Sequence, residues 1–430
     1  MASKFHYKFM RWRVWVANAS FKSMRLSFFP HGWWRRHLDA GHRKLIKSVF
    51  PVLVLISFVS VLLVNYLPPV VAQLPRQEIR GVWMTNNDFD ILKDRRKVQD
   101  ATSKLRQLNF NTIYPVMWNS GYVMYPSAVA RREGIQPFVF RGSDGHDILA
   151  DIINQAHRQG LLAIPWFEFG FMAPPTSELA LNHPEWLTQK RNGEETSISA
   201  AGEVVWLNPF HPQVQRFITD LVVEAVTQYD VDGIQFDDHM SLPHEFGYDR
   251  YTVDLYTRET KNPPPANSQD PEWVNWRADK ITAFMIRLNQ AVKSRKPNVI
   301  FSISPNYYDF AYRFQLQDWL NWIRMDIVDE LIVQVYRPNL QSFISTISRP
   351  DIQEAQRVIP TGIGVMTGLR NNPVPMQQIQ SQVRATRERG LGVAFFYYGS
   401  LWNYSSDDFQ ERKAGFQALF PAPALRARIE

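Results

Sequence analysis

Between Glu78 and Leu419, strand-like segments alternate with helix-like segments, and this alternation limits the folds that the chain can adopt. Alternating strands and helices form parallel sheets, because each helix carries the chain back to the start of the next strand. Eight such units over roughly 350 residues predict an α/β fold, the (β/α)8 or TIM barrel. The strands are expected at Ile79–Thr85, Thr112–Trp118, Leu161–Phe169, Gly233–Asp238, Ile300–Ser304, Leu331–Tyr336, Ile359–Met366 and Val393–Tyr398. The helices are expected at Arg95–Leu108, Asp147–Gln159, Pro212–Gln228, Trp273–Ser294, Leu316–Asp326, Asn339–Thr346, Met376–Arg389 and Asp407–Leu419.

Two of the connections that follow strands are long. Gly170–Trp206 follows the third strand and Met240–Pro271 follows the fourth. Both would lie at the C-terminal face of a barrel, where barrel enzymes carry their active sites, and long loops there usually shape a substrate cleft. An open, doubly wound sheet is the alternative fold. The absence of a Gly-rich phosphate loop after the first strand argues against it.

The fourth strand carries carboxylates at its end. In Val231–His239, apolar Ile234 and Phe236 alternate with polar Gln235 and Asp237. Successive side chains on a strand point to opposite faces, so the polar pair is expected inside the barrel. A buried carboxylate is costly unless it is paired or used, which makes Asp237 a candidate catalytic group. The alternative is that Asp237 or Asp238 only caps a helix or anchors a loop.

A second acid, Glu168, ends the neighbouring third strand. Two carboxyl groups on adjacent strands suit general acid and base chemistry, as in glycoside hydrolysis. We therefore select Glu168, Asp237 and Asp238 as candidate catalytic residues. Aromatic and amide side chains at the other strand ends suit sugar binding through flat stacking and hydrogen bonds. The candidate substrate-binding residues are Trp118, Trp166, Trp206, His239, Asn306, Gln334, Tyr336 and Tyr398.

Other site types have weak support in the sequence. His239 and His244 lie beside the acids and are candidates for a zinc site, but no metal-binding spacing such as HExxH accompanies them. The chain has no cysteine, no Gly-x-Ser-x-Gly elbow and no phosphate-binding Gly-x-x-x-x-Gly-Lys loop. We therefore expect neither a metal nor a cofactor.

The basic residues gather at the N-terminus. Residues 1–47 hold eleven Lys or Arg and one acid, so the remainder carries a net charge of −3 although the whole chain carries +7. This distribution argues against nucleic acid binding by the body, residues 76–420. Residues 48–72 form an apolar run that is typical of an export signal and is near the lower length limit for a membrane anchor. The body is then expected in the periplasm or elsewhere outside the cytoplasm. Residues 421–430 are expected to form a frayed tail.

Several motifs in this order resemble the glycosyl hydrolase-like 10 family. They are Arg80-Gly81-Val82-Trp83, Asn111-Thr112-Ile113-Tyr114, Pro165-Trp166-Phe167-Glu168, Trp206-Leu207-Asn208-Pro209, Asp232–His239 and Gln334-Val335-Tyr336. The resemblance runs from about Glu78 to Leu419 and implies a (β/α)8 barrel in an exported bacterial protein. It also implies glycoside hydrolysis, with activity of an envelope member on peptidoglycan strands that lack stem peptides. Glu168, Asp237 and Asp238 match acids of the family pattern, whereas His239 stands where other members carry an aromatic residue. Association with the cell-division machinery is implied by the resemblance alone.

The leading hypothesis is an exported glycoside hydrolase that cleaves peptide-free cell-wall glycan, with Glu168 as the general acid and Asp237 as nucleophile or base. The reverse assignment of acid and base is the alternative for the same pair. One alternative is an α-glucan or exopolysaccharide hydrolase on the same barrel. A second is a non-catalytic glycan-binding protein of the envelope. A third is a metal-dependent envelope hydrolase that uses His239 and His244.

Overall fold

The computed structural model describes Leu55 and residues 76–136 and 146–426. The expected basic segment and, apart from Leu55, the expected apolar run lie outside the described residues, as does the connection between residues 137 and 145. Residues from Pro75 onward form one compact unit. None of the helices among the described residues is long and apolar enough to cross a membrane.

The body is a closed barrel of parallel strands, which confirms the predicted fold. Strand β1 pairs with both β2 and β13, and this double pairing closes the sheet. In chain order the barrel strands are β1 (Arg80–Met84), β2 (Thr112–Asn119), β4 (Leu162–Ala163) with β5 (Trp166–Phe167), β9 (Gly233–Asp237), β10 (Ile300–Ser304), β11 (Glu330–Gln334), β12 (Thr361–Met366) and β13 (Gly392–Phe396). Each expected strand therefore exists, and its ends lie within two residues of the expected ones.

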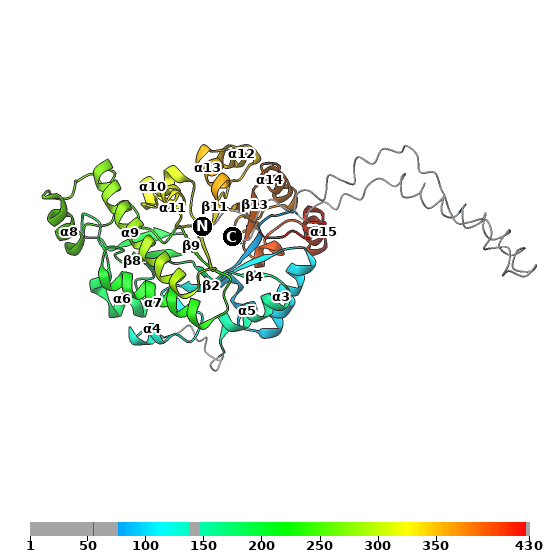
Figure 1. Ribbon diagram of the computed structural model, residues 1–430, viewed down its shortest axis with the longest axis horizontal. Coiled ribbons are helices and arrows are strands. Elements are labelled where there is room, and N and C mark those ends of the chain that lie inside the picture. Colours follow the sequence, from blue (N-terminus) through cyan, green and yellow to red (C-terminus); the bar gives the residue numbers. More distant parts are fainter. Residues whose placement is uncertain (1–54, 56–75, 137–145, 427–430) are drawn as a thin grey trace, which may run out of the picture. The chain divides into compact units, whose positions relative to one another are not determined.

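Helices cover the outside of the strands (Figure 1). The helices that join successive strands are, in chain order, α3 (Arg95–Gln107), α5 (Ile148–Arg158), α7 (Pro212–Gln228), α9 (Pro271–Arg295), α11 (Trp319–Arg324), α12 (Leu340–Ile347) with α13 (Pro350–Val358), and α14 (Met376–Glu388). The last helix, α15 (Phe409–Leu419), follows β13. Most begin at a side-chain cap, as where Asp94 accepts from the backbone of Arg96 and Lys97 at the start of α3. The sequence prediction missed α13 and also α10 (Tyr308–Gln315), which precedes α11.

The third barrel strand is interrupted at Pro165. The expected segment Leu161–Phe169 divides into β4 and β5, which both pair with β2. Proline has no N–H to donate, although the Pro165 carbonyl still accepts from the backbone of Gln235 at 2.8 Å. A break in register of β2 at Val116 and Trp118 accompanies the division.

The two long connections carry structure of their own. After β5, β6 (Met172–Ala173), β8 (Gly202–Trp206) and β7 (Thr196–Ser199) form a small antiparallel sheet. After β9, the connection contains α8 (Arg250–Thr260). Buried Arg277 of α9 donates to the carbonyls of His244, Phe246 and Ser268, so it ties this connection to the outer helix. Both connections thus contain regular secondary structure, and the one after β9 is also bound to α9.

A column of polar contacts fills the barrel interior. Trp83 Nε1 donates to Gln235 at 2.7 Å, and Gln235 donates to Ser302 on the neighbouring strand at 3.0 Å. Ser302 and Tyr114 each donate to Glu330 Oε1 at 2.9 Å. Trp83 lies on β1 and Gln235 on β9, and these strands are not neighbours in the sheet, so their side chains meet across the barrel interior. The inward direction predicted for Gln235 is therefore confirmed.

Residues 421–426 cover the end of the barrel opposite to the acids, where Glu330 lies. Leu425 forms a parallel bridge with Gln77, and Arg426 forms an ion pair with Glu330 inside the barrel. The carbonyl of Ala422 accepts from Arg80 at 2.6 Å. The expectation of a frayed tail is wrong for residues 421–426, because a buried carboxylate needs the cation that this segment supplies.

Candidate active site

Glu168 follows β5 at the C-terminal mouth of the barrel. Asn119, the last residue of β2, donates its side-chain amide to Glu168 Oε2 at 2.7 Å. Burial raises the pKa of Glu168 to about 8, and the nearby carboxyl groups of Asp237 and Asp88 act in the same direction. Glu168 is therefore mainly protonated at neutral pH and can donate a proton.

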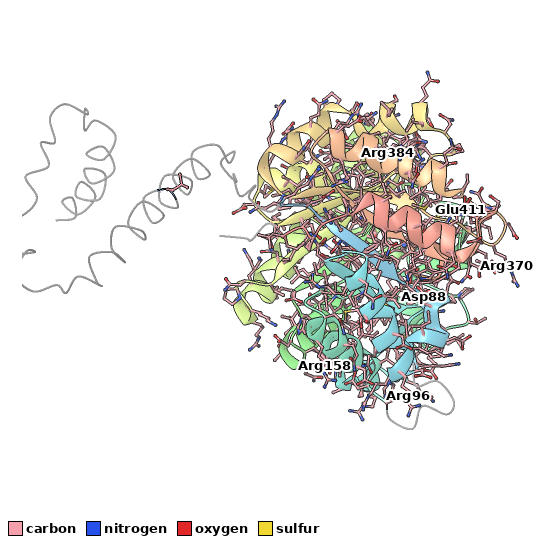
Figure 2. The ribbon with its side chains drawn as sticks, turned by 90° about the vertical axis from the view of Figure 1, so that its right-hand side faces the viewer. Asp88, Arg96, Arg158, Arg370, Arg384 and Glu411 are labelled. Carbon is pink, nitrogen blue, oxygen red and sulfur yellow. The ribbon has the colours of Figure 1, made fainter. Side chains whose placement is uncertain are left out.

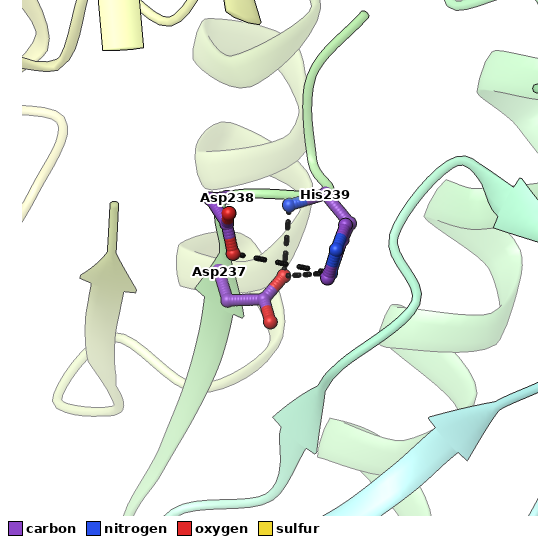
Figure 3. A group of neighbouring side chains, drawn as sticks. All are labelled: Asp237, Asp238 and His239. Atoms are coloured by element: carbon purple, nitrogen blue, oxygen red, sulfur yellow. Dashed lines mark hydrogen bonds and ion pairs between the residues drawn. The ribbon is translucent and has the colours of Figure 1, made fainter. Parts of the chain in front are cut away.

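Asp237 ends β9, and its side chain is only 3% exposed. Burial raises its pKa to about 6, while His239 opposes the rise. The backbone N–H of His239 donates to Asp237 Oδ1 at 2.9 Å, and Nδ1 of the same residue lies 3.2 Å from that oxygen (Figure 3). Burial lowers the pKa of His239, but the carboxylates of Asp237 and Asp238 outweigh burial and raise it to about 10. At neutral pH the site thus holds an Asp237 carboxylate beside an imidazolium.

Asp238 is held by amide side chains from other segments at the mouth. Asn306 and Gln315 donate to its Oδ2 at 3.0 and 3.1 Å, and Gln334 donates to its Oδ1 at 3.1 Å. These three donors come from the loop after β10, from α10 and from β11. The predicted residues Asn306 and Gln334 therefore bind the acid itself, and they fix the direction in which it points.

Aromatic side chains surround the acids. Tyr336 lies close enough to all three acids to interact with their charges, and burial together with these carboxylates raises the pKa of its phenol. The ring of Phe396 lies 5.5 Å from Tyr336 and 6.4 Å from Trp166, measured between ring centres. The ring of Trp206 lies 6.3 Å from His239. Tyr336, Trp166 and Trp206 are thus gathered at the mouth with the acids.

Trp118 is directed away from the site. Its ring is fully buried against Phe217 of α7, and its indole donates to the carbonyl of Gly170 at 3.0 Å. The break in register of β2 reverses the alternation of side chains and turns Asn119 inward instead. The prediction that Trp118 binds substrate is therefore replaced by a packing role. Asn119 directly follows Trp118 in the sequence, and this position at the end of the second strand was the only sign that it could lie in the site.

Asp88 is a further acid at the mouth that the sequence prediction missed. It follows β1, is 3% exposed, and accepts from the backbone N–H of Thr85 at 3.0 Å and of Gly399 at 2.8 Å (Figure 2). Burial raises its pKa to about 7. The predicted residue Tyr398 is buried nearby, stacked edge-on with Trp402 at 6.1 Å. The signal for Asp88 was the Thr85-x-x-Asp88 capping pattern after the first strand.

The side chains that could hold a metal ion are Asp237, Asp238 and His239, which form the one such group among the described residues. His239 Nδ1 lies 2.7 Å from the carbonyl oxygen of Glu168, so this nitrogen carries a proton and is not free to bind a metal. His244 is directed elsewhere, because its Nδ1 lies 2.9 Å from Ser268. The pair of histidines considered for zinc is therefore not brought together.

The amino-acid sequence has relatives of known family. The profile of the glycosyl hydrolase-like 10 family matches residues 78–385. Glycosyl hydrolase DigH of Escherichia coli is 24% identical over 313 residues, which cover 63% of this chain and 68% of DigH. Glycosyl hydrolase YngK of Bacillus subtilis is 21% identical over 305 residues, which cover 60% of this chain and 54% of YngK.

The fold is similar to that of solved barrels. The glycoside hydrolase domain of PgaB (BpsB) from Bordetella bronchiseptica superposes with a TM-score of 0.60 and 15% identity, over 82% of this chain and all of that domain. At this identity the likeness concerns the fold, which agrees with the TIM barrel described above.

Proposed function

Because the chain belongs to the glycosyl hydrolase-like 10 family, we propose that it is a glycoside hydrolase that cleaves bacterial cell-wall glycan after the stem peptides have been removed. Glycoside hydrolase activity is supported by the family and by the relatives that bear this name. The peptide-free substrate rests on the resemblance of the strand-end motifs. Location outside the cytoplasm is part of the proposal and rests on the basic and apolar composition of residues 1–72.

The observation that carries the proposal is the difference between two acids at the ends of adjacent strands, the partly buried Glu168 and the buried Asp237. The pKa of Glu168 is raised to about 8 and that of Asp237 to about 6, so near pH 7 one is protonated and the other ionised. Glycoside hydrolysis requires this combination, because one carboxyl protonates the leaving oxygen while the other carboxylate acts at the sugar carbon or on water.

Each residue has a role in the proposed reaction. Glu168 donates its proton to the glycosidic oxygen, which allows the bond to the sugar carbon to break. Asp237 either attacks that carbon or takes a proton from the attacking water. Its carboxylate is stabilised by the imidazolium of His239. Asp238, oriented by its three amide donors, and Tyr336 position the sugar or the water.

The test is a digestion assay with the purified full-length chain and its Asp237→Asn variant. Intact peptidoglycan, peptide-free glycan strands and an α-glucan are incubated in parallel, and the products are identified by mass spectrometry. The proposal expects fragments from the peptide-free strands that are absent with the variant. Fragments from the α-glucan alone would indicate the alternative substrate. Unchanged fragments with Asp237→Asn would refute the proposed mechanism.

A protein that binds glycan without cleaving it is distinguished in the same experiment. Such a protein would release no fragment from any substrate and would still sediment with insoluble glycan. A Glu168→Gln variant adds a second comparison. The enzyme is expected to keep glycan binding and to lose turnover in this variant.

A further inference from the structure

A row of aromatic rings runs along α10, between two of the amide side chains that hold Asp238. The ring centres of Tyr307 and Phe310 are 5.9 Å apart, and those of Phe310 and Phe314 are 5.3 Å apart. Residues three and four positions apart share one face of a helix, so the row follows the helix axis. We call Tyr307, Phe310, Arg313 and Phe314, with Arg337 beside them, the α10 rim.

The α10 rim is continuous with the acids. Asn306 precedes the row and Gln315 follows it, and both donate to Asp238 Oδ2. Phe310 lies between these two residues in the sequence and is 36% exposed, so part of its apolar ring faces solvent. An exposed aromatic face offers the flat surface on which a sugar ring stacks.

Two arginines accompany the rings. The guanidinium of Arg337 lies 5.5 Å from the centre of the Tyr307 ring, and that of Arg313 lies 5.7 Å from the centre of Phe314. Arg349 also lies over Tyr307, but it forms ion pairs with Asp309 and Asp351. Among the described residues, neither Arg313 nor Arg337 forms an ion pair with a carboxylate.

We propose that the α10 rim is a binding site for a sugar unit that carries a free carboxylate. Stacking on Phe310 would hold the sugar ring, and Arg337, which is half-buried beside Tyr336, would bind the carboxylate. A guanidinium presents paired N–H groups that match a carboxylate and binds it more strongly than it binds a neutral amide.

This site would explain a preference for peptide-free strands, and it therefore rests on the proposed function. Removal of the stem peptide from N-acetylmuramic acid leaves a lactyl group that ends in a carboxylate, whereas the intact strand has an amide at that position. The charge is present only in the stripped strand. Arg337 would thus distinguish the two forms by electrostatics rather than by shape.

The experiment compares Phe310→Ala and Arg337→Gln with two matched controls. Phe409→Ala removes another exposed aromatic ring, which lies on α15 near Lys104, and Arg384→Gln removes an exposed arginine of α14 (Figure 2). The substrates are peptide-free glycan strands and the same strands with their carboxylates converted to methylamides. The kcat and KM values are measured for each pair, and circular dichroism confirms that each variant is folded.

Loss of the ring should raise KM by about 5-fold to 10-fold for both substrates with little change in kcat. Loss of the guanidinium should raise KM by about 10-fold for the carboxylated strands only. The controls should leave both values unchanged. Equal KM values for the rim variants and the controls would overturn this inference, and so would an Arg337→Gln effect that is the same on the methylamide strands.

The two proposals can fail separately. If Asp237→Asn abolishes cleavage while the rim variants behave as wild type, the proposed function stands and the α10 rim has no role in it. If the protein cleaves no glycan, co-sedimentation with insoluble peptide-free glycan still measures whether Phe310→Ala and Arg337→Gln weaken binding. Wild-type affinity of both variants in that assay would overturn the inference as well.

Discussion

His239 presents both its backbone N–H and its ring nitrogen Nδ1 to the same carboxylate oxygen of Asp237, at 2.9 and 3.2 Å. The same ring nitrogen lies 2.7 Å from the carbonyl oxygen of Glu168. One histidine therefore connects the ends of two neighbouring barrel strands, one followed by the partly buried Glu168 and the other ending in the buried Asp237. The electrostatics of both acids depend on it, because the charge of His239 lowers the pKa of each.

The pH dependence of activity follows from these pKa values. Turnover requires Asp237 to be ionised, which occurs above a pKa of about 6, and Glu168 to be protonated, which occurs below a pKa of about 8. We expect a bell-shaped profile of kcat/KM with its maximum near pH 7. Initial rates measured between pH 4 and pH 10 check this. A profile that stays flat from pH 5 to pH 9 would remove the two acids from the proposed roles.

Replacement of His239 by Gln should move the whole profile to higher pH. The substitution removes a positive charge that favours the ionised form of both acids, so the pKa values of both acids rise. The measurement is the same pH profile on His239→Gln. His244→Gln is the matched control, because His244 contacts Ser268 instead of the acids and should leave both limbs in place. A shift of equal size in the control would contradict the prediction.

Glu168→Gln should abolish turnover and stabilise the fold at alkaline pH. The folded-state pKa of about 8 exceeds the ordinary value of 4.5, so between these values the unfolded chain binds fewer protons and wild-type stability falls as pH rises. Glutamine does not titrate. From these two pKa values we expect the variant to gain about 4 kcal/mol over wild type at pH 8 and little at pH 4.

Thermal unfolding of wild type and Glu168→Gln across this pH range checks the prediction. Asp237→Asn should show a smaller gain that is complete at a lower pH, because the pKa of Asp237 rises from 3.8 to only about 6. A stability difference for Glu168→Gln that is the same at pH 4 and pH 8 would mean that Glu168 is ionised in the folded state.

Gly170→Ala should disrupt the site as well as the fold. Gly170 has a φ of +48°, and a Cβ there would lie 2.3 Å from the carbonyl of His239. Backbone cannot yield at that distance, so we expect a loss of about 3 kcal/mol or more together with a loss of activity. Gly193→Ala is the control, because Gly193 has a φ of +87° but open space around it. The control should cost only about 1–2 kcal/mol and keep activity.

Arg426→Gln should destabilise the barrel from the face opposite to the acids. The substitution leaves Glu330 buried in the barrel without its cation, which costs about 3–5 kcal/mol. The double variant Glu330→Gln with Arg426→Gln should recover part of this loss, because no charge is then buried. Denaturant unfolding of wild type, Arg426→Gln, Glu330→Gln and the double variant gives the coupling between the two residues. Full stability of Arg426→Gln would show that the ion pair with Glu330 does not stabilise the fold.

Most of the barrel could be predicted from local patterns. Apolar alternation and helix periodicity are properties of neighbouring residues, and they located each barrel strand to within a few residues. Pro165 was visible in the sequence. That it divides the third strand into β4 and β5 depends on how this strand pairs with β2, which the sequence does not show. Helix α10 was missed, although its residues border the candidate site.

Part of the candidate site could be predicted because the local patterns that locate the strands also locate their ends. Glu168, Asp237 and Asp238 stand directly at strand ends, and parallel strands bring their ends to one face of the barrel. Trp118 and Asn119 could not be separated, because the break in register that exchanges their directions arises from pairing with β5. Asp88 was missed because its burial comes from residues distant in the sequence, such as Gly399.

The sequence by itself determined the order of strands and helices, the barrel that they form and the acids that meet at its mouth. Only the tertiary structure decided that Asn119 rather than Trp118 faces Glu168, that amides from three segments hold Asp238, and that Arg426 neutralises Glu330. It also decided which acid is protonated at neutral pH. The physical reason is that secondary structure follows from neighbours along the chain, whereas a pKa depends on burial and on charges that folding brings together.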